Sequence, residues 1–75
     1  MKKYRKLVSL MTDIERSVLL SLCDAINAAP EKSTRLLEIV SHHDDKTESY
    51  KNIIEILKNS KNVVKINKDI RSCFR

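Results

Sequence analysis

The residues best suited to chemistry in this sequence are basic side chains gathered at its two ends. The first seven residues carry no acid, and they include Lys2, Lys3, Arg5 and Lys6. Residues 58–75 form a second basic group with Asp69 as its one acid; its members are Lys58, Lys61, Lys65, Lys68, Arg71 and Arg75. Such asymmetry indicates an anionic partner, such as nucleic acid. The alternative interpretation is a solvated surface that only keeps the protein soluble.

The middle of the chain is acidic overall and holds one cluster of possible metal ligands, Ser41-His42-His43-Asp44-Asp45. Imidazole and carboxylate groups are common ligands, but a tight site needs about four that converge. Neighbouring residues point in different directions, and no second cluster completes the set. We therefore expect a polar loop here, with no metal and no cofactor.

Other catalytic signatures are not found in the sequence. It contains no Ser-His-Asp, Walker or Cys-x-x-Cys arrangement, and a chain of 75 residues is short for a deep pocket. The apolar run Leu7–Met11 is too short for a signal peptide or a membrane span. We expect a cytoplasmic protein that is not an enzyme, has no small-molecule substrate and keeps Cys23 and Cys73 as free thiols in apolar positions.

The elements that position these residues are expected to be mostly helical, because the chain has no glycine and a single proline. Residues 1–75 form one domain, which begins with a basic arm over 1–11. Thr12-Asp13-Ile14-Glu15 has the pattern of a capping box and predicts a helix over 12–28. Pro30 ends that helix, because proline disfavours helical backbone in the residue before it.

Two further helices follow from apolar residues at helical spacing. Leu36, Leu37, Ile39 and Val40 predict a helix over 32–41. A helix over 46–59 is predicted by Tyr50, Ile53, Ile54 and Leu57, and Asp45 precedes Glu48 at capping distance. We expect one core cluster made by Ile14, Val18, Leu22, Leu36, Val40, Ile53, Ile54 and Leu57.

Residues 62–75 allow two structures. Val64, Ile66, Ile70 and Phe74 alternate around the turn-like Asn67-Lys68-Asp69, which favours a β-hairpin. Val63, Ile66, Ile70 and Cys73 also share one helical face. The sequence predicts a mainly α fold, a compact three-helix domain with a short C-terminal hairpin. The alternative is an all-α helical bundle.

Three helices followed by a basic hairpin resemble a small winged helix-turn-helix domain, over about residues 13–75. The resemblance implies DNA binding, with the helix 46–59 in the major groove and the hairpin as a wing on the adjacent backbone. The leading hypothesis is therefore a small DNA-binding transcriptional regulator. Its phosphate contacts would come from the arm and the wing, and base contacts from Lys51, Asn52 or Lys58. The expected nucleic-acid site is Lys2, Lys3, Arg5, Lys6, Lys51, Asn52, Lys58, Lys61, Lys65, Lys68 and Arg71.

The second hypothesis is a helical adaptor or inhibitor that binds another protein or a second copy of itself. Leu20 falls on the polar side of the helix 12–28, and Cys23 lies near its boundary. Leu19, Leu20 and Cys23 would then form the interface, and the charged ends would steer the encounter.

Overall fold

The protein is mainly helical, as expected from its composition. The computed structural model describes residues 2–42 and 46–74, with no strand among them. The elements are α1 (Lys2–Ser9), α2 (Asp13–Ala28), η1 (Pro30–Lys32), α3 (Ser33–Ser41), α4 (Glu48–Asn59), α5 (Val63–Arg71) and η2 (Ser72–Phe74), where η marks a short 3₁₀ helix.

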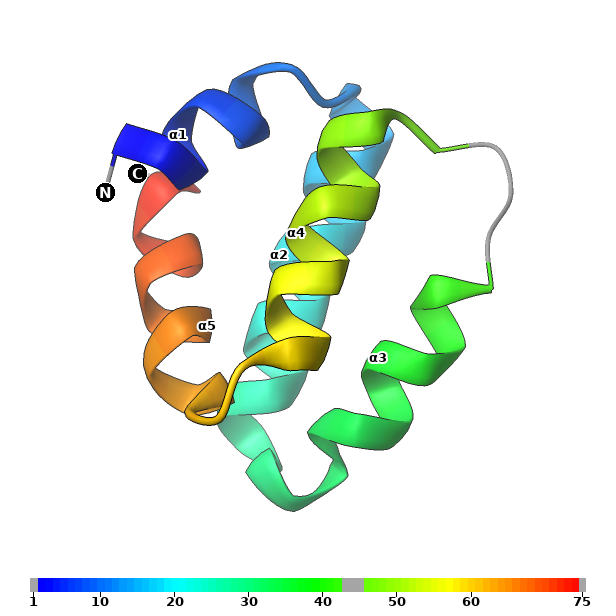
Figure 1. Ribbon diagram of the computed structural model, residues 1–75, viewed down its shortest axis with the longest axis vertical. Helices are drawn as coiled ribbons and strands as arrows, with labels where there is room; N and C mark the ends of the chain where they lie inside the picture. The colour runs from blue at the N-terminus through cyan, green and yellow to red at the C-terminus, as the bar shows by residue number, and fades with distance from the viewer. Residues whose placement is uncertain (1, 43–45, 75) are drawn as a thin grey trace.

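The helices are arranged around the pair α2 and α4 (Figure 1). In this view α4 lies in front of α2, α3 lies to one side of the pair, and α1 and α5 lie to the other side. The start of α1 and the end of the chain at η2 lie side by side, and α1 contacts both α5 and η2. The two basic ends of the sequence therefore meet in space.

The core lies between these helices and draws on all five α-helices of the described residues. Its buried members are Tyr4, Val8, Met11, Leu19, Leu22, Cys23, Ile26, Leu37, Tyr50, Ile53, Ile54, Leu57 and Ile70. Each large aliphatic side chain so buried contributes about 1.5–3 kcal/mol. The prediction is confirmed for Leu22, Ile53, Ile54 and Leu57, while Val18, Leu36 and Val40 are only partly buried against this cluster. For Ile14 it is wrong, because that side chain is 72% exposed.

The predicted start of α2 is confirmed in detail. Thr12 is the N-cap, its hydroxyl accepts from the Glu15 amide, and the Glu15 side chain accepts from the Thr12 amide. After Ala28 the chain passes through η1, with Pro30 at its start, where the missing N–H costs nothing. The predicted helix 32–41 thus begins as α3 at Ser33.

The predicted helix 46–59 begins two residues later than expected. Its N-cap is Thr47, whose hydroxyl accepts from the Tyr50 amide, and α4 starts at Glu48. The predicted cap Asp45 lies outside the described residues.

The predicted basic arm is a helix, α1, that belongs to the core. Tyr4 and Val8, one turn apart, are 7% and 5% exposed. The chain leaves the helix between Leu10 and Thr12, so α1 does not continue into α2.

The predicted C-terminal hairpin is wrong, and with it the wing of the predicted fold. Residues 63–71 form α5, and Asn62 caps it by accepting from the Lys65 amide. Helical spacing places Asn67 and Ile70 on one inward face, both fully buried. Strand propensity depends strongly on packing context, and here the fit against α2 decides the structure. Of the two sequence-based alternatives, the all-α bundle is the one formed.

Candidate nucleic-acid interface

The strongest candidate site is an exposed basic edge built from both ends of the chain. We define the basic edge as Arg5 and Lys6 on α1, Lys61 in the link before α5, and Lys65 and Lys68 on α5, all of which are exposed. Because α1 contacts α5 and η2, cations about 60 residues apart in sequence stand on neighbouring elements (Figure 1). Lys2 and Lys3, the two remaining basic residues of the predicted N-terminal arm, open α1.

Buried anchors on each helix turn the helical cations outward. Tyr4 and Val8 bury one face of α1, and Asn67 and Ile70 bury one face of α5. Arg5 and Lys6 fall between the anchors of α1, and Lys65 and Lys68 flank Asn67 at positions that helical periodicity turns to solvent.

The seam between α2 and α5 fixes the orientation of α5 through polar contacts. The Asn67 side-chain amide donates to the Cys23 carbonyl and to Asn27 Oδ1, both at 3.0 Å. On the exposed side of the seam, Arg71 Nε donates to Asp24 Oδ1 at 2.9 Å. Arg71 was expected to bind phosphate, but its guanidinium group is already paired with a carboxylate.

The residues of the basic edge, by contrast, take part in none of the described ion pairs. Within the described part of the chain, the ion pairs are Arg16 with Asp13, His42 with Glu38 and Arg71 with Asp24. None of them includes a residue of the basic edge. The charges of the edge are therefore free to attract an anionic partner.

The exposed face of α4 does not collect the residues expected to read bases. Lys51 lines a hollow toward α3 with Val40 and Lys46, whereas Asn52 lines another toward α1 with Lys6. Glu55 borders both hollows and so stands between them. A carboxylate at the centre of this face would be repelled by DNA phosphates.

Lys58, the third expected base reader, lies on another side of α4. It borders a hollow with Ser33 and Thr34 of α3 and Val63 of α5. The three residues therefore face three different hollows, and the structure does not bring them together.

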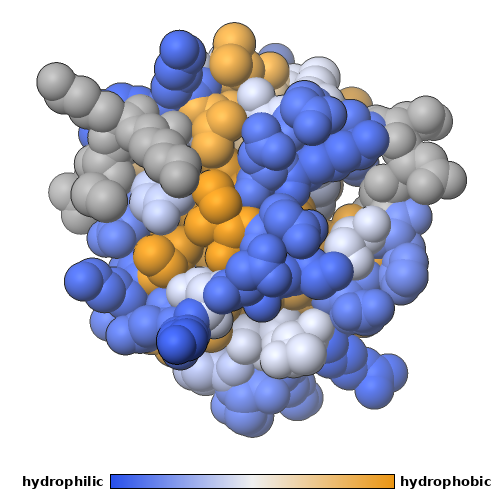
Figure 2. Space-filling view, viewed as in Figure 1, coloured by the Kyte–Doolittle hydropathy of each residue, from blue (hydrophilic) through white to orange (hydrophobic). Residues whose placement is uncertain are grey.

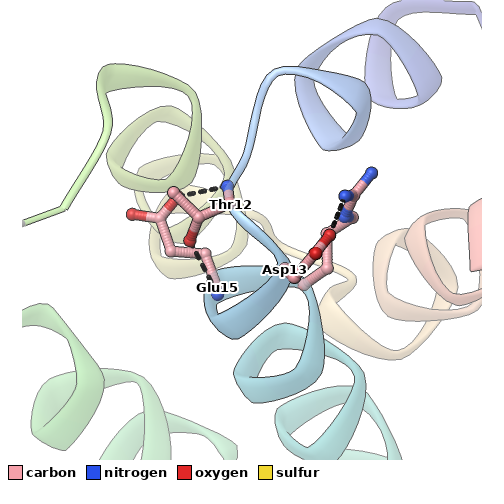
Figure 3. A network of polar contacts seen from close by, with 4 residues as sticks. Thr12, Asp13 and Glu15 are labelled. Carbon is pink, nitrogen blue, oxygen red and sulfur yellow. Dashed lines mark hydrogen bonds and ion pairs between the residues drawn. The ribbon is translucent and has the colours of Figure 1, made fainter.

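A buried carboxylate, missed by the sequence-based site prediction, joins the starts of α2 and α4. Glu15 is 3% exposed, and its carboxylate accepts from the Thr12 amide at 3.0 Å (Figure 3). It also accepts from the Thr47 amide at 2.7 Å and the Thr47 hydroxyl at 2.9 Å. We call this set of contacts the Glu15 junction. The contacts between Glu15 and Thr12 could be predicted from the capping-box pattern. The contacts with Thr47 could not, because Thr47 is 32 residues away.

The hydrogen bonds of the Glu15 junction stabilise the charged carboxylate. Burial by itself raises the pKa of Glu15, but the donors from Thr47 and Thr12, together with the positive charge of Lys46, outweigh it and hold the pKa below its ordinary value. Burial and the charge of Glu15 raise the pKa of the neighbouring Tyr50. Glu15 is thus an ionised structural group.

The predicted protein interface is largely inside the core. Leu19 and Cys23 are fully buried and cannot contact a partner, and Leu20 is partly buried. Cys23 and Cys73 are free thiols, as expected. Burial raises the pKa of Cys23 to about 12, which keeps this thiol neutral and a poor nucleophile.

Apolar surface does exist, but at other positions. A shallow groove of about 400 Å³ between α2 and α3 is lined by Val18, Leu22, Leu36 and Val40, among others. Figure 2 shows a further apolar strip on the face where α4 lies in front, and the hollow between α1 and α4 has Leu7 and Ile56 as apolar walls.

Metal and membrane signatures were sought in the described residues only. No group of three or more His, Cys, Asp or Glu side chains there could hold a metal ion, and His43, Asp44 and Asp45 lie outside that part. No described helix combines the length and apolar character needed to cross a membrane.

In comparisons with protein-family models, curated proteins and solved structures, nothing matches this chain. The function has to be argued from its surface.

Proposed function

We propose that the protein is a small DNA-binding regulator that holds phosphates on the basic edge. The observation that carries this proposal is the meeting of the two basic ends on one side of the fold, without carboxylate partners among the described ion pairs. A duplex carries about one negative charge per 1.7 Å of its axis, so clustered lysines gain affinity by releasing its counterions.

The packing of α1 argues against an anionic membrane as the partner. A basic amphipathic helix can lie on a membrane if its apolar face is free to enter the lipid. Here Tyr4 and Val8 of that face are buried in the core. The exposed residues of α1 include Arg5 and Lys6 and no large apolar side chain, which suits phosphates.

The same surface favours binding with little sequence preference. Phosphate contacts fix the register of a protein on DNA but do not read bases. The residues expected to read bases lie apart on α4, with Glu55 between Lys51 and Asn52. Changing Lys51 and Asn52 to Ala should therefore alter affinity similarly for unrelated duplexes.

A matched pair of double variants tests the proposal. Lys65→Ala with Lys68→Ala removes two charges from the basic edge, and Lys32→Ala with Arg35→Ala removes two exposed charges from η1 and α3. Fluorescence anisotropy against a random duplex at several salt concentrations gives the slope of log affinity against log salt. The edge variant should flatten that slope by up to about 2, since each phosphate contact contributes about 0.9.

The control variant should keep the slope of the wild type. Equal effects of the two variants would show that charge alone matters and that the edge is not the site. No salt-sensitive binding by the wild-type protein would refute the proposed function.

A second candidate function, a protein-binding adaptor, is favoured by the groove between α2 and α3. The groove is nearly all apolar, and exposed Ile14 and Ile39 extend its helices' apolar stripes, at 72% and 55% exposure. The occupant that suits such a groove is an amphipathic helix of a partner protein.

This candidate is tested by NMR titration with a designed amphipathic Leu/Lys helical peptide. Saturable shifts at Val18, Leu36 and Val40, lost in a folded Val40→Glu variant, would support the adaptor. Shifts without saturation, or shifts spread over the surface, would exclude it. Concentration-dependent shifts without peptide would identify a second copy as the occupant instead.

A further inference from the structure

We infer that the basic edge recognises a DNA duplex in preference to a single strand. This inference rests on the proposed function and names the class of nucleic acid that the same site takes. Three features of the described residues carry it: the placement of the aromatic rings, the layout of the cations on two helices, and the identity of those cations.

The aromatic side chains are not placed for stacking on bases. Proteins that bind single strands combine a basic groove with exposed aromatic rings, each of which stacks on a base. All three aromatic residues of this chain lie in its described part. Tyr4 and Tyr50 are 7% and 1% exposed, and Phe74 is partly buried against the core. The edge therefore lacks the exposed aromatic rings on which single-strand binding depends.

The layout of the cations suits two rows of phosphates. Arg5 and Lys6 stand on α1, and Lys65 and Lys68 stand on α5, which α1 contacts. In Figure 1 α1 runs across the end of α5, so the cations of the two helices lie along two different directions. A duplex carries a row of phosphates on each strand, so both helices can contact phosphate at once. A single strand offers one row and would engage one helix at a time.

The identity of the cations points the same way. Four of the five residues of the basic edge are lysines, whose compact charge contacts phosphate without stacking. Arginine stacks on bases, but the edge has one arginine, Arg5, and the neighbouring Arg71 is held by Asp24. The edge is therefore built to sense the charge of a backbone.

The experiment compares three labelled probes of one sequence: a 20-base-pair DNA duplex, its isolated strand and the matching RNA duplex. Anisotropy titrations of the intact protein at two salt concentrations should show the DNA duplex bound about tenfold more tightly than the strand at the same salt. The salt slope should also be steeper for the duplex, because it engages both rows of cations.

Phe74→Leu provides the control for stacking. If Phe74 stacks on bases, this variant weakens single-strand binding and leaves duplex binding unchanged, which would count against the inference. An equal affinity of the wild type for strand and duplex would overturn it but leave the proposed function standing. Tighter binding of the RNA duplex would overturn the assignment to DNA. Absence of salt-sensitive binding to all three probes would remove the proposed function itself.

Discussion

The Glu15 junction and the basic edge use charge in opposite ways. At the junction one carboxylate is covered by the fold and accepts from three donors on Thr12 and Thr47. On the edge five cations stand in solvent, and none belongs to an ion pair among the described residues. In the first arrangement the charged carboxylate joins the starts of α2 and α4 through hydrogen bonds. The second leaves its charge exposed to solvent.

The difference shows how charges that support the fold can be separated from charges available for binding. A charge whose hydrogen-bonding capacity is met inside the fold stabilises the fold. A charge that is exposed and held among like charges adds little stability and raises the local potential. Substitutions at the junction should therefore change stability, and substitutions on the edge should change binding.

The largest effect on stability is expected for Glu15→Ala. The variant leaves the Thr47 amide and hydroxyl without their acceptor and removes half of the capping box, at a cost of about 2–3 kcal/mol. Urea denaturation measures the loss. Asp13→Ala, on an exposed acid of the same turn, is the control and should cost less than about 1 kcal/mol. Similar losses in both variants would mean that the junction is no stronger than a surface contact.

The stability given by Glu15 should also depend on pH. Its pKa in the folded protein lies below the ordinary value of 4.5, so the folded state favours the charged form. The contribution is complete above the unfolded pKa and is lost as pH falls through the folded pKa. Thermal melts between pH 7 and pH 2 should show the advantage of wild type over Glu15→Gln shrinking below about pH 4.5. A constant difference across that range would contradict the ionised junction.

Arg71→Ala tests the comparison further. Arg71 lies on α5 beside the basic edge, but its charge is paired within the fold, with Asp24. Loss of its pair with Asp24 should cost about 0.2–1 kcal/mol, the usual range for an exposed pair. The salt slope of DNA binding should hardly change, whereas Lys68→Ala should lower it by about 0.9. If Arg71→Ala lowers the slope as much as Lys68→Ala does, the Asp24 pair does not withhold Arg71 from DNA.

The smallest effect on stability is expected for the double variant of Lys65 and Lys68. Both side chains are exposed, so their truncation should change the free energy of unfolding by less than about 0.5 kcal/mol. Relief of like-charge repulsion could make the change slightly favourable. Chemical denaturation of the samples used for DNA binding checks this directly. A large loss of stability would show that these lysines support the fold.

The sequence was most informative where local rules decide the structure. The Thr12–Glu15 capping box located the start of α2, and helical spacing located the buried face of α4. It was least informative where distant contacts decide. The inward face of α2 includes Glu15 and Leu19 in place of Ile14, because a carboxylate with three donors can be buried. The sequence around Glu15 does not indicate that Thr47, 32 residues away, provides two of these three donors.

The C-terminal segment shows the same limit. Asn67 looks like a turn residue until α2 supplies the Cys23 carbonyl and the Asn27 side chain as partners for its amide. For the candidate site, the basic character of both ends was readable from the sequence, but their meeting was not. It depends on Tyr4 and Ile70 entering one core, which is a property of the whole fold.

The closure of the fold by α5 has a consequence for the order of assembly. During synthesis α1 through α4 emerge before α5, which then packs against α1 and α2. Closing so long a loop costs entropy that is offset only when the core forms. Until α5 has packed, the lysines of the basic edge stand on two separate segments. Under the proposed function, chains in which α5 has not yet packed would bind DNA less tightly than the folded protein.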